Sequence, residues 1–277
     1  MLDLLDTPGP LTVETVGSCD WVAPLSGLVN LSHEKAKAAG LAERDEPIEV
    51  FFHAVRHPEL GTFIVDTGIE RALRDAPDRA AIRGLVASAM RTERMRAKTP
   101  LGDWVQREKL AGVFLTHMHP DHVSGMPDVP RGTAIYVGPA ESRERALRNL
   151  VLQRTMNRLL EGHAPLSVLQ FRPDPDGRFR GVIDVFGDGS FWAIHVPGHT
   201  RGSLAYVART ASGPVLLVGD TSHTAWGWLN GVEPGSFTAD RAANAVALEK
   251  LRALAAEHPA MSVRLGHKRL EAAQPQR

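Results

Sequence analysis

Short runs of β-branched, aromatic and aliphatic residues alternate with turns rich in glycine and proline along most of the chain. In the first half these runs cover 48–55, 62–68, 112–116 and 134–137. In the second half they cover 181–185, 191–196, 203–208, 215–218 and 262–265. Such runs, bounded by turn signals, are typical of buried strands. The pattern therefore predicts two groups of strands, of which the second, joined by glycine turns, forms a largely antiparallel sheet.

Helical periodicity is clearest in two segments that follow these strands. One face of 240–257 is apolar and consists of Ala247, Leu248, Leu251, Leu254 and Ala255. Charged residues lie opposite, which predicts an amphipathic helix. Apolar residues at helical spacing also predict a long helix over 140–160. Because strands with helices are followed by strands with helices again, we expect an α+β fold. Two mixed β-sheets would pack between outer helices in an αββα sandwich.

The remaining stretches differ in character. Residues before 47 include several prolines and glycines, which predicts loops and short strands. The stretch 69–110 is rich in arginine and alanine and is predicted to be helical. Its bases form either a solvated helix face or a pocket wall that attracts anionic substrates. At the end of the chain, 274–277 is predicted to be a frayed tail.

Length and charge narrow the class of protein. The 277 residues suffice for one large domain or two small ones. The 32 basic residues balance the 32 acidic ones, so no nucleic-acid partner is expected. No stretch approaches membrane-spanning length, and acids stand where a signal peptide would carry bases. Cys19 is the only cysteine, which excludes an intramolecular disulfide. We therefore expect a cytoplasmic protein with no membrane partner.

The densest chemistry lies in the run His-Met-His-Pro-Asp-His, which begins at His117 and follows a predicted strand. Three imidazoles and a carboxylate within six residues suit zinc and its first-row neighbours as ligands. Pro120 is expected to exclude a helix through the run, which would place the ligands on a loop. In that loop His117 and His119 can face one ion. Asp121 and His122, beyond the proline, can face a second.

Three further ligand candidates stand next to a glycine where a predicted strand ends: His199, Asp220 and His267. With the six-residue run, and in this order, they resemble the metallo-β-lactamase fold superfamily of metallo-hydrolases. The matching sequences are Thr-His-Met-His-Pro-Asp-His at 116–122, Pro-Gly-His-Thr at 197–200, Gly-Asp at 219–220 and Gly-His at 266–267. The strand and turn over 63–68 are similar to the family's early hairpin. The resemblance implies a single αββα domain, with 69–110 as a helical, basic insertion.

The same resemblance implies a dinuclear metal centre. The implied ligands are His117, His119 and His199 for the first ion, Asp121, His122 and His267 for the second, and Asp220 as the bridge between them. The cofactors would be two divalent ions, with zinc favoured and iron, manganese or cobalt as alternatives. A hydroxide held between the ions would be the nucleophile. Asp121 would accept its hydrogen bond and later pass the proton to the leaving group.

Residues around this set could contact the substrate or support the ligands. In the family's acyl-homoserine lactonases, a tyrosine at the position that matches His223 donates a hydrogen bond to the substrate carbonyl. His223 could act there as a donor or an acid, and this departure leaves lactonase identity open. Trp226 and Trp228 either pack beneath a loop or line the substrate pocket. Asp66 either caps its own turn or orients a metal-bound histidine.

We therefore expect a dinuclear metal-dependent hydrolase that uses a metal-bridging hydroxide to cleave an ester-like bond, with a lactone as the favoured substrate. A thioesterase resembling glyoxalase II and a phosphoester or phosphotriester hydrolase are the alternatives, because the same two-ion site serves each. A di-iron redox protein of the same fold is a weaker alternative, since the ten residues after His267 leave no room for a flavodoxin-like domain. The expected partner is a small-molecule substrate, and the resemblance is compatible with a homodimer.

Overall fold

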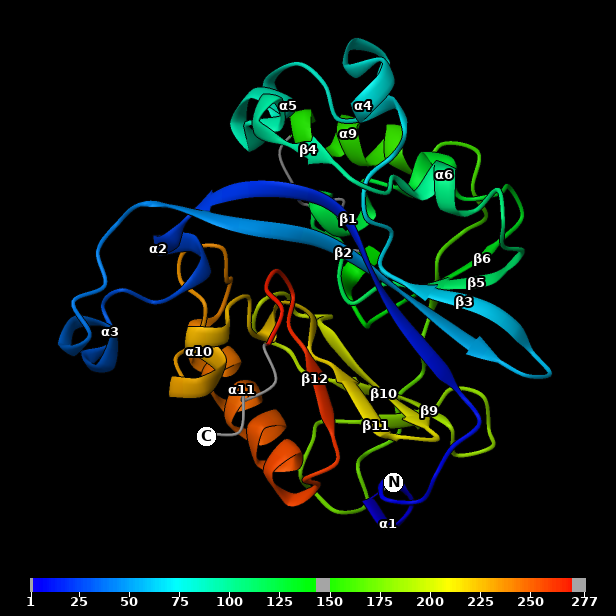
Figure 1. Ribbon diagram of the computed structural model, residues 1–277, viewed down its shortest axis with the longest axis vertical. Helices are drawn as coiled ribbons and strands as arrows, with labels where there is room; N and C mark the ends of the chain where they lie inside the picture. The colour runs from blue at the N-terminus through cyan, green and yellow to red at the C-terminus, as the bar shows by residue number, and fades with distance from the viewer. Residues whose placement is uncertain (1, 143–149, 271–277) are drawn as a thin grey trace, which may run out of the picture.

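Two β-sheets pack face to face between two layers of helices in the computed structural model (Figure 1). The structure describes residues 2–142 and 150–270. Helices α4, α5, α6 and α9 lie on the outer side of one sheet, and α10 and α11 lie on the outer side of the other. The predicted αββα sandwich of the α+β class is confirmed.

The first sheet has seven strands in the order β4-β1-β2-β3-β5-β6-β7. Their bounds are β1 Thr12–Pro24, β2 Asp45–His57, β3 Gly61–Val65, β4 Arg96–Ala97, β5 Leu110–Phe114, β6 Ala134–Val137 and β7 Ser167–Val168. The pairs from β4 to β3 are antiparallel, and those from β3 to β7 are parallel. The expected hairpin of β2 and β3 is present. Parallel strands place their carboxyl ends at one edge, so β3 and β5 deliver Asp66 and His117 to the same side.

The second sheet has five strands in the order β12-β11-β10-β9-β8. Their bounds are β8 Val182–Asp184, β9 Phe191–His195, β10 Leu204–Thr210, β11 Gly213–Leu217 and β12 Ser262–Arg264. It is antiparallel except for the β11–β12 pair, as the glycine turns predicted. Because β11 and β12 run in parallel, Asp220 and His267 follow them at the same edge.

Most helices outside α11 are short. The α-helices are α1 Leu2–Leu5, α2 Leu25–Leu28, α3 Glu34–Ala38, α4 Ala72–Asp75, α5 Leu85–Met90, α6 Leu101–Trp104, α7 Pro120–Val123, α9 Leu150–Leu159, α10 Ala225–Asn230 and α11 Arg241–Glu257. The 3₁₀ helices are η1 Pro77–Arg79, η2 Thr92–Arg94, η3 Met126–Asp128 and η4 Gly219–Thr221. Asp240 caps α11, since its carboxylate accepts from the Ala243 amide. Within 2–142 and 150–270, no helix is long and apolar enough to cross a membrane.

Two expectations need revision, and two others fall partly or wholly outside the described residues. The segment before 47 was expected to hold only short strands, yet β1 has 13 residues and pairs with β2 over nearly its whole length. The stretch 69–110 is a series of short helices with a two-residue strand, β4, rather than a continuous helical segment. In the expected helix over 140–160, the described part is α9, and 143–149 lies outside the described residues. The tail 274–277 also lies outside them.

Apolar side chains fill each of the three layer boundaries. Between the sheets, Val65 and Phe114 pack against Phe191 and Tyr206, all buried. A second cluster joins the seven-stranded sheet to α5, α6 and α9, and a third joins the five-stranded sheet to α11. Burial of this apolar area is the main stabilising contribution to the fold. It also fixes the strand ends that carry the candidate ligands.

Glu70 makes the stability of this core depend on pH. It is 3% exposed, and its Oε1 accepts from the Ala81 amide at 2.6 Å. Burial raises its pKa from 4.5 to about 7, against the effect of that hydrogen bond. The folded state therefore binds more protons than the unfolded state between these values, so this group's contribution to stability falls as pH rises.

We predict that Glu70→Gln reduces this loss of stability at higher pH, because glutamine keeps the acceptor oxygen and has no charge to desolvate. The free energy of unfolding of the variant, relative to wild type, should rise by about 2–3 kcal/mol from pH 5 to pH 8. Urea unfolding of both proteins at several pH values measures this difference. A difference that does not change with pH would contradict the prediction.

Candidate metal centre

The first ligand candidates follow β5. Pro120 does not exclude a helix, as the sequence suggested, but begins the short helix α7 with His119 at its N-cap. Proline suits the first helical position because the amide it lacks has no partner there. Asp121 and His122 consequently lie in the first turn of α7. The bend at Pro120 still separates them from His117.

The other candidates come from the second sheet. His199 follows β9, Asp220 lies in η4 after β11, and His267 follows β12. Gly266 allows the end of β12 to lie close to Asp220, since a Cβ at this position would lie only 2.2 Å from Asp220 Oδ1. Gly266 therefore lets the β12 end lie directly against the carboxylate.

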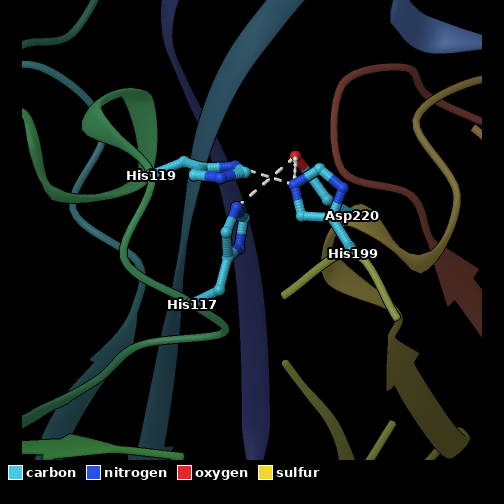
Figure 2. A group of neighbouring side chains, drawn as sticks. All are labelled: His117, His119, His199 and Asp220. Carbon is cyan, nitrogen blue, oxygen red and sulfur yellow. Dashed lines mark hydrogen bonds and ion pairs between the residues drawn. The ribbon is translucent and has the colours of Figure 1, made fainter. Parts of the chain in front are cut away.

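These side chains converge in two groups that share one carboxylate. The first group is His117, His119, His199 and Asp220 (Figure 2). The second group is Asp121, His122, Asp220 and His267. In each group the candidate ligand atoms lie within 4.8 Å of one another. The structure thus brings together all seven residues predicted to bind metal.

Asp220 lies at the centre of both groups. Its Oδ2 is 3.3 Å from His199 Nε2 and 3.7 Å from His117 Nε2 in the first group. In the second group it is 3.2 Å from His122 Nε2 and 3.5 Å from His267 Nε2. Of the seven residues, only His119 and Asp121 are partly exposed. A carboxylate in this position could bridge two cations.

Two bound cations would explain the positions of these polar atoms better than hydrogen bonds among the atoms themselves. His117 Nε2, His122 Nε2 and Asp220 Oδ1 are buried and make no hydrogen bond within the described residues. His119 Nδ1 and His199 Nε2 face each other at 2.8 Å, although both are ring nitrogens. Buried polar atoms without hydrogen bonds are costly and rare in folded proteins. Imidazole nitrogens and carboxylate oxygens with no thiolate suit zinc and other first-row divalent ions.

Groups behind the histidines orient the rings. Asp66 Oδ2 lies 2.8 Å from His122 Nδ1, and Asp66 also accepts from the Thr116 amide and hydroxyl. The backbone carbonyl of Glu49 lies 3.0 Å from His267 Nδ1. An acceptor at Nδ1 leaves Nε2 free of a proton and directed at the centre. Asp66 therefore supports a histidine, the second of the two roles considered for it, although its φ of 58° also places it in a turn.

The charges of the centre depend strongly on one another. Burial would raise the pKa of Asp220, but His122, His223 and His267 outweigh burial and hold it well below its usual value. Burial would lower the pKa of His267, but Asp220 and Asp121 raise it to about 10. By contrast, burial and neighbouring histidines keep the pKa of His117 well below its usual value. The carboxylates of Asp220 and Asp121 thus favour positive charge beside them, which divalent ions would supply.

His223 lies at the centre, whereas the two tryptophans do not. His223 is buried, with Nε2 3.0 Å from Asp220 Oδ2 and Nδ1 3.2 Å from the Leu28 carbonyl oxygen. Trp228 is buried in the core between the five-stranded sheet and α11. Trp226 packs against the α2 region and lines a separate pocket. Of the two alternatives considered for them, these contacts favour packing, since neither tryptophan is among the residues that line the cavity at the ligands.

A cavity of about 530 Å³ opens onto the ligands. Its apolar wall includes Trp21, Leu28, Ile48, Met90, Leu152 and Phe237. These residues come from β1, α2, β2, α5, α9 and the loop before α11, so no local pattern in the sequence could have identified them. The β-branched residues at the start of β1 could have indicated a strand that contains Trp21, but not its place in the cavity wall.

The basic stretch supplies one arginine to this cavity. Arg91 lines the wall and pairs with both oxygens of Asp45 at 2.7 and 2.8 Å. Arg71 and Arg74 pair with Asp103 away from the cavity. Several of these bases are therefore paired with acids, and Asp45 is shared between Arg91 and Arg94.

Comparisons with known proteins agree with this geometry. The sequence profile described as the Metallo-beta-lactamase superfamily matches residues 50–267. The chain is 26% identical over 172 residues to a protein named gamma-lactamase MBL2 of Gibberella moniliformis, covering 58% of this chain and 70% of that one. It is 35% identical over 85 residues to the N-acyl homoserine lactonase AttM of Azorhizobium caulinodans, covering 30% of this chain and 32% of that one.

Solved structures show the same fold at low identity. An N-acyl homoserine lactone hydrolase with bound N-hexanoyl-L-homoserine aligns with a TM-score of 0.67 and 18% identity, over 94% of each chain. A quorum-quenching N-acyl homoserine lactone lactonase aligns with a TM-score of 0.68 and 17% identity, over 98% of this chain and 97% of that one. The profile match spans most of the chain and contains all seven converging residues. This chain belongs to the metallo-beta-lactamase superfamily and is a hydrolase of that fold.

Proposed function

We propose that the protein is a dinuclear metal-dependent hydrolase that opens lactones. The observation that carries this proposal is the pair of ligand groups that share Asp220. His117, His119 and His199 would hold one ion, Asp121, His122 and His267 the other, and Asp220 both. Zinc suits these ligands, with iron, manganese and cobalt as alternatives. Bound ions would supply hydroxide near neutral pH and polarise the substrate carbonyl.

The protein's own residues would perform the remaining steps. Asp220 would contribute one negative charge between the two ions and so reduce their repulsion. Asp121 is partly exposed and lies 3.3 Å from His267 Nε2, so its carboxylate stands between the centre and the cavity. From there it would accept the proton of the attacking water and return it to the leaving alkoxide. His223 lines the cavity beside Asp220 and would contact the substrate's reacting group.

The cavity favours a neutral, largely apolar substrate. Most of its wall is apolar, and Arg91, its cation apart from the histidines, contacts Asp45, which Arg94 also contacts. Two bound ions would serve either kind of ester, but an apolar wall suits a neutral lactone or thioester better than a charged phosphoester. The match to a lactonase at 35% identity adds support for a lactone. A thioesterase is the second candidate, because the chain is also 32% identical over 130 residues to a hydroxyacylglutathione hydrolase of Pseudomonas putida.

A substrate screen tests this proposal. The purified protein would be assayed against lactones, thioesters, aryl esters and phosphotriesters, with zinc, manganese, cobalt and iron supplied separately. We expect the highest kcat/KM for a lactone with an apolar substituent. A preference for thioesters would support the second candidate, and inactivity toward every ester-like substrate with each metal would refute both.

His223 should matter for turnover but not for metal content. A group that contacts the reacting carbonyl contributes up to about 3 kcal/mol to the transition state, and a partly matched one less. We therefore expect His223→Ala to lower kcat/KM on the best substrate roughly ten- to hundred-fold. His223→Tyr should shift the preference toward lactones. Metal content, measured by elemental analysis, should remain that of the wild type.

His53 offers a matched control for this experiment. It is also a buried histidine, but it bonds to Thr15 and lies outside the cavity. His53→Ala should change stability without changing kcat/KM. If His223→Ala behaves in the same way, His223 only packs against its neighbours and has no contact with the substrate.

A further inference from the structure

Glu141 is a buried carboxylate that none of the chemistry above uses. Its side chain is 1% exposed and follows β6, far in sequence from His199. One oxygen, Oε2, accepts from the backbone amide of Met118 at 2.9 Å. The other oxygen, Oε1, accepts a short hydrogen bond from the Thr200 hydroxyl. Met118 separates His117 from His119, and Thr200 directly follows His199.

The two contacts connect the two segments that supply the first ligand group. His117 and His119 come from the first sheet and His199 from the second, so only tertiary contacts set their separation. The Thr200 hydroxyl lies 2.9 Å from the Ser203 hydroxyl, which itself accepts from the Thr200 amide. This arrangement fixes the His199 loop against the carboxylate. Glu141 thus links both segments through hydrogen bonds to the two oxygens of one carboxyl group.

The backbone conformation before Glu141 directs its carboxylate toward the buried region between the two ligand segments. Ala140 has φ of 70°, a left-handed conformation that is unfavourable for a residue with a Cβ. A Cβ on Gly202 would lie 2.3 Å from the Pro139 carbonyl oxygen, so the Glu141 turn and the His199 loop lie in direct contact. Strain of this kind persists only where surrounding contacts enforce it. The Glu141 turn and the His199 loop therefore hold each other in place.

We propose that Glu141 is a positioning residue that sets the metal affinity of the His117, His119 and His199 group. Without its carboxylate the two segments would lose their shared acceptor, and the three nitrogens would no longer be held at one separation. The second ligand group would be affected less, because His122 and His267 are oriented by Asp66 and Glu49 instead. The inference rests on the proposed dinuclear function.

Zinc titration of the metal-free chain against a chromophoric chelator tests this inference. Residues that support metal ligands typically contribute ten- to hundred-fold to metal affinity. We expect Glu141→Ala to weaken one of the two zinc sites by about this factor and to leave the other near its wild-type affinity. Glu141→Gln keeps an acceptor for the Met118 amide, so its loss should be smaller. In a His267→Ala background, where the second group is already impaired, Glu141→Ala should remove the remaining tight site.

Asp174→Ala is the matched control. Asp174 is also a buried carboxylate, but it accepts from the amides of Asp176, Arg178 and Phe179, away from the ligand loops. It should lower the melting temperature and leave both zinc affinities unchanged. If Glu141→Ala does not fold, Glu141→Gln and Thr200→Val, each removing part of the link, must still weaken one site several-fold. Two unchanged sites in these variants would overturn the inference and leave the proposed function standing, whereas a wild type that binds no zinc would overturn both.

Discussion

Asp220→Ala should abolish turnover while the protein still folds. Asp220 Oδ2 lies 3.2 to 3.7 Å from the Nε2 atoms of four candidate ligands, so the mutation removes the one carboxylate common to both groups. Two bound cations would then repel each other with less compensation, and hydroxide between them would be held poorly. We expect kcat to fall by about a thousandfold or more, the scale measured for single groups that stabilise transition-state charge.

The measurement pairs steady-state kinetics with thermal unfolding of the metal-loaded variant. Asp174→Ala again serves as the control, since it removes a buried carboxylate outside the centre. Turnover near the wild-type rate in Asp220→Ala would show that Asp220 does not bridge metal ions. If Asp220→Ala loses activity because it unfolds completely, the experiment would be repeated with Asp220→Asn. This variant keeps the shape of the side chain and removes its charge.

Removal of metal should have the second large effect. Five histidines and two aspartates converge within the protein, and several of their buried atoms make no hydrogen bond among the described residues. We expect two equivalents of transition metal per chain after gentle purification. Chelation should abolish hydrolysis and destabilise the fold, because an ion present at a thousand times its Kd contributes about 4 kcal/mol to stability.

Elemental analysis and melting curves before and after chelation measure both effects. Added zinc, manganese, cobalt or iron should restore activity to different extents, which identifies the metals that the centre accepts. A metal content that is consistently near zero, with no activity restored, would refute the dinuclear proposal. A single equivalent would show that one ligand group binds weakly.

Much of this fold could be predicted from the sequence because its signals are local. Runs of β-branched and aromatic residues marked the strands, and the apolar face of α11 marked the longest helix. The candidate ligands were identifiable because three imidazoles and a carboxylate occur within six residues, and because His199, Asp220 and His267 each follow a strand beside a glycine. Each of these residues follows a strand, so predicting the strands also indicated where the candidate ligands lie.

Most of the features that the sequence did not predict depend on tertiary contacts, Pro120 being the exception. Prolines and glycines before residue 47 obscured β1, whose 13 residues become a strand by pairing with β2. Pro120 was read as a helix breaker, although at the first helical position it begins α7. Trp226 and Trp228 are near Asp220 in sequence, yet Trp228 is buried in the core and Trp226 packs against the α2 region. The cavity wall is assembled from distant segments, so adjacency in sequence carried no information about it.

The division of the ligands between the two sheets has a mechanical consequence. His117, His119, Asp121 and His122 belong to the first sheet, and His199, Asp220 and His267 belong to the second. Ions bound by both sets would cross-link halves of the chain up to 150 positions apart, which in the unfolded state could separate freely. Cys19 has no partner with which to form a disulfide. Bound metal would thus form a reversible cross-link between the halves, in addition to the apolar core between the sheets.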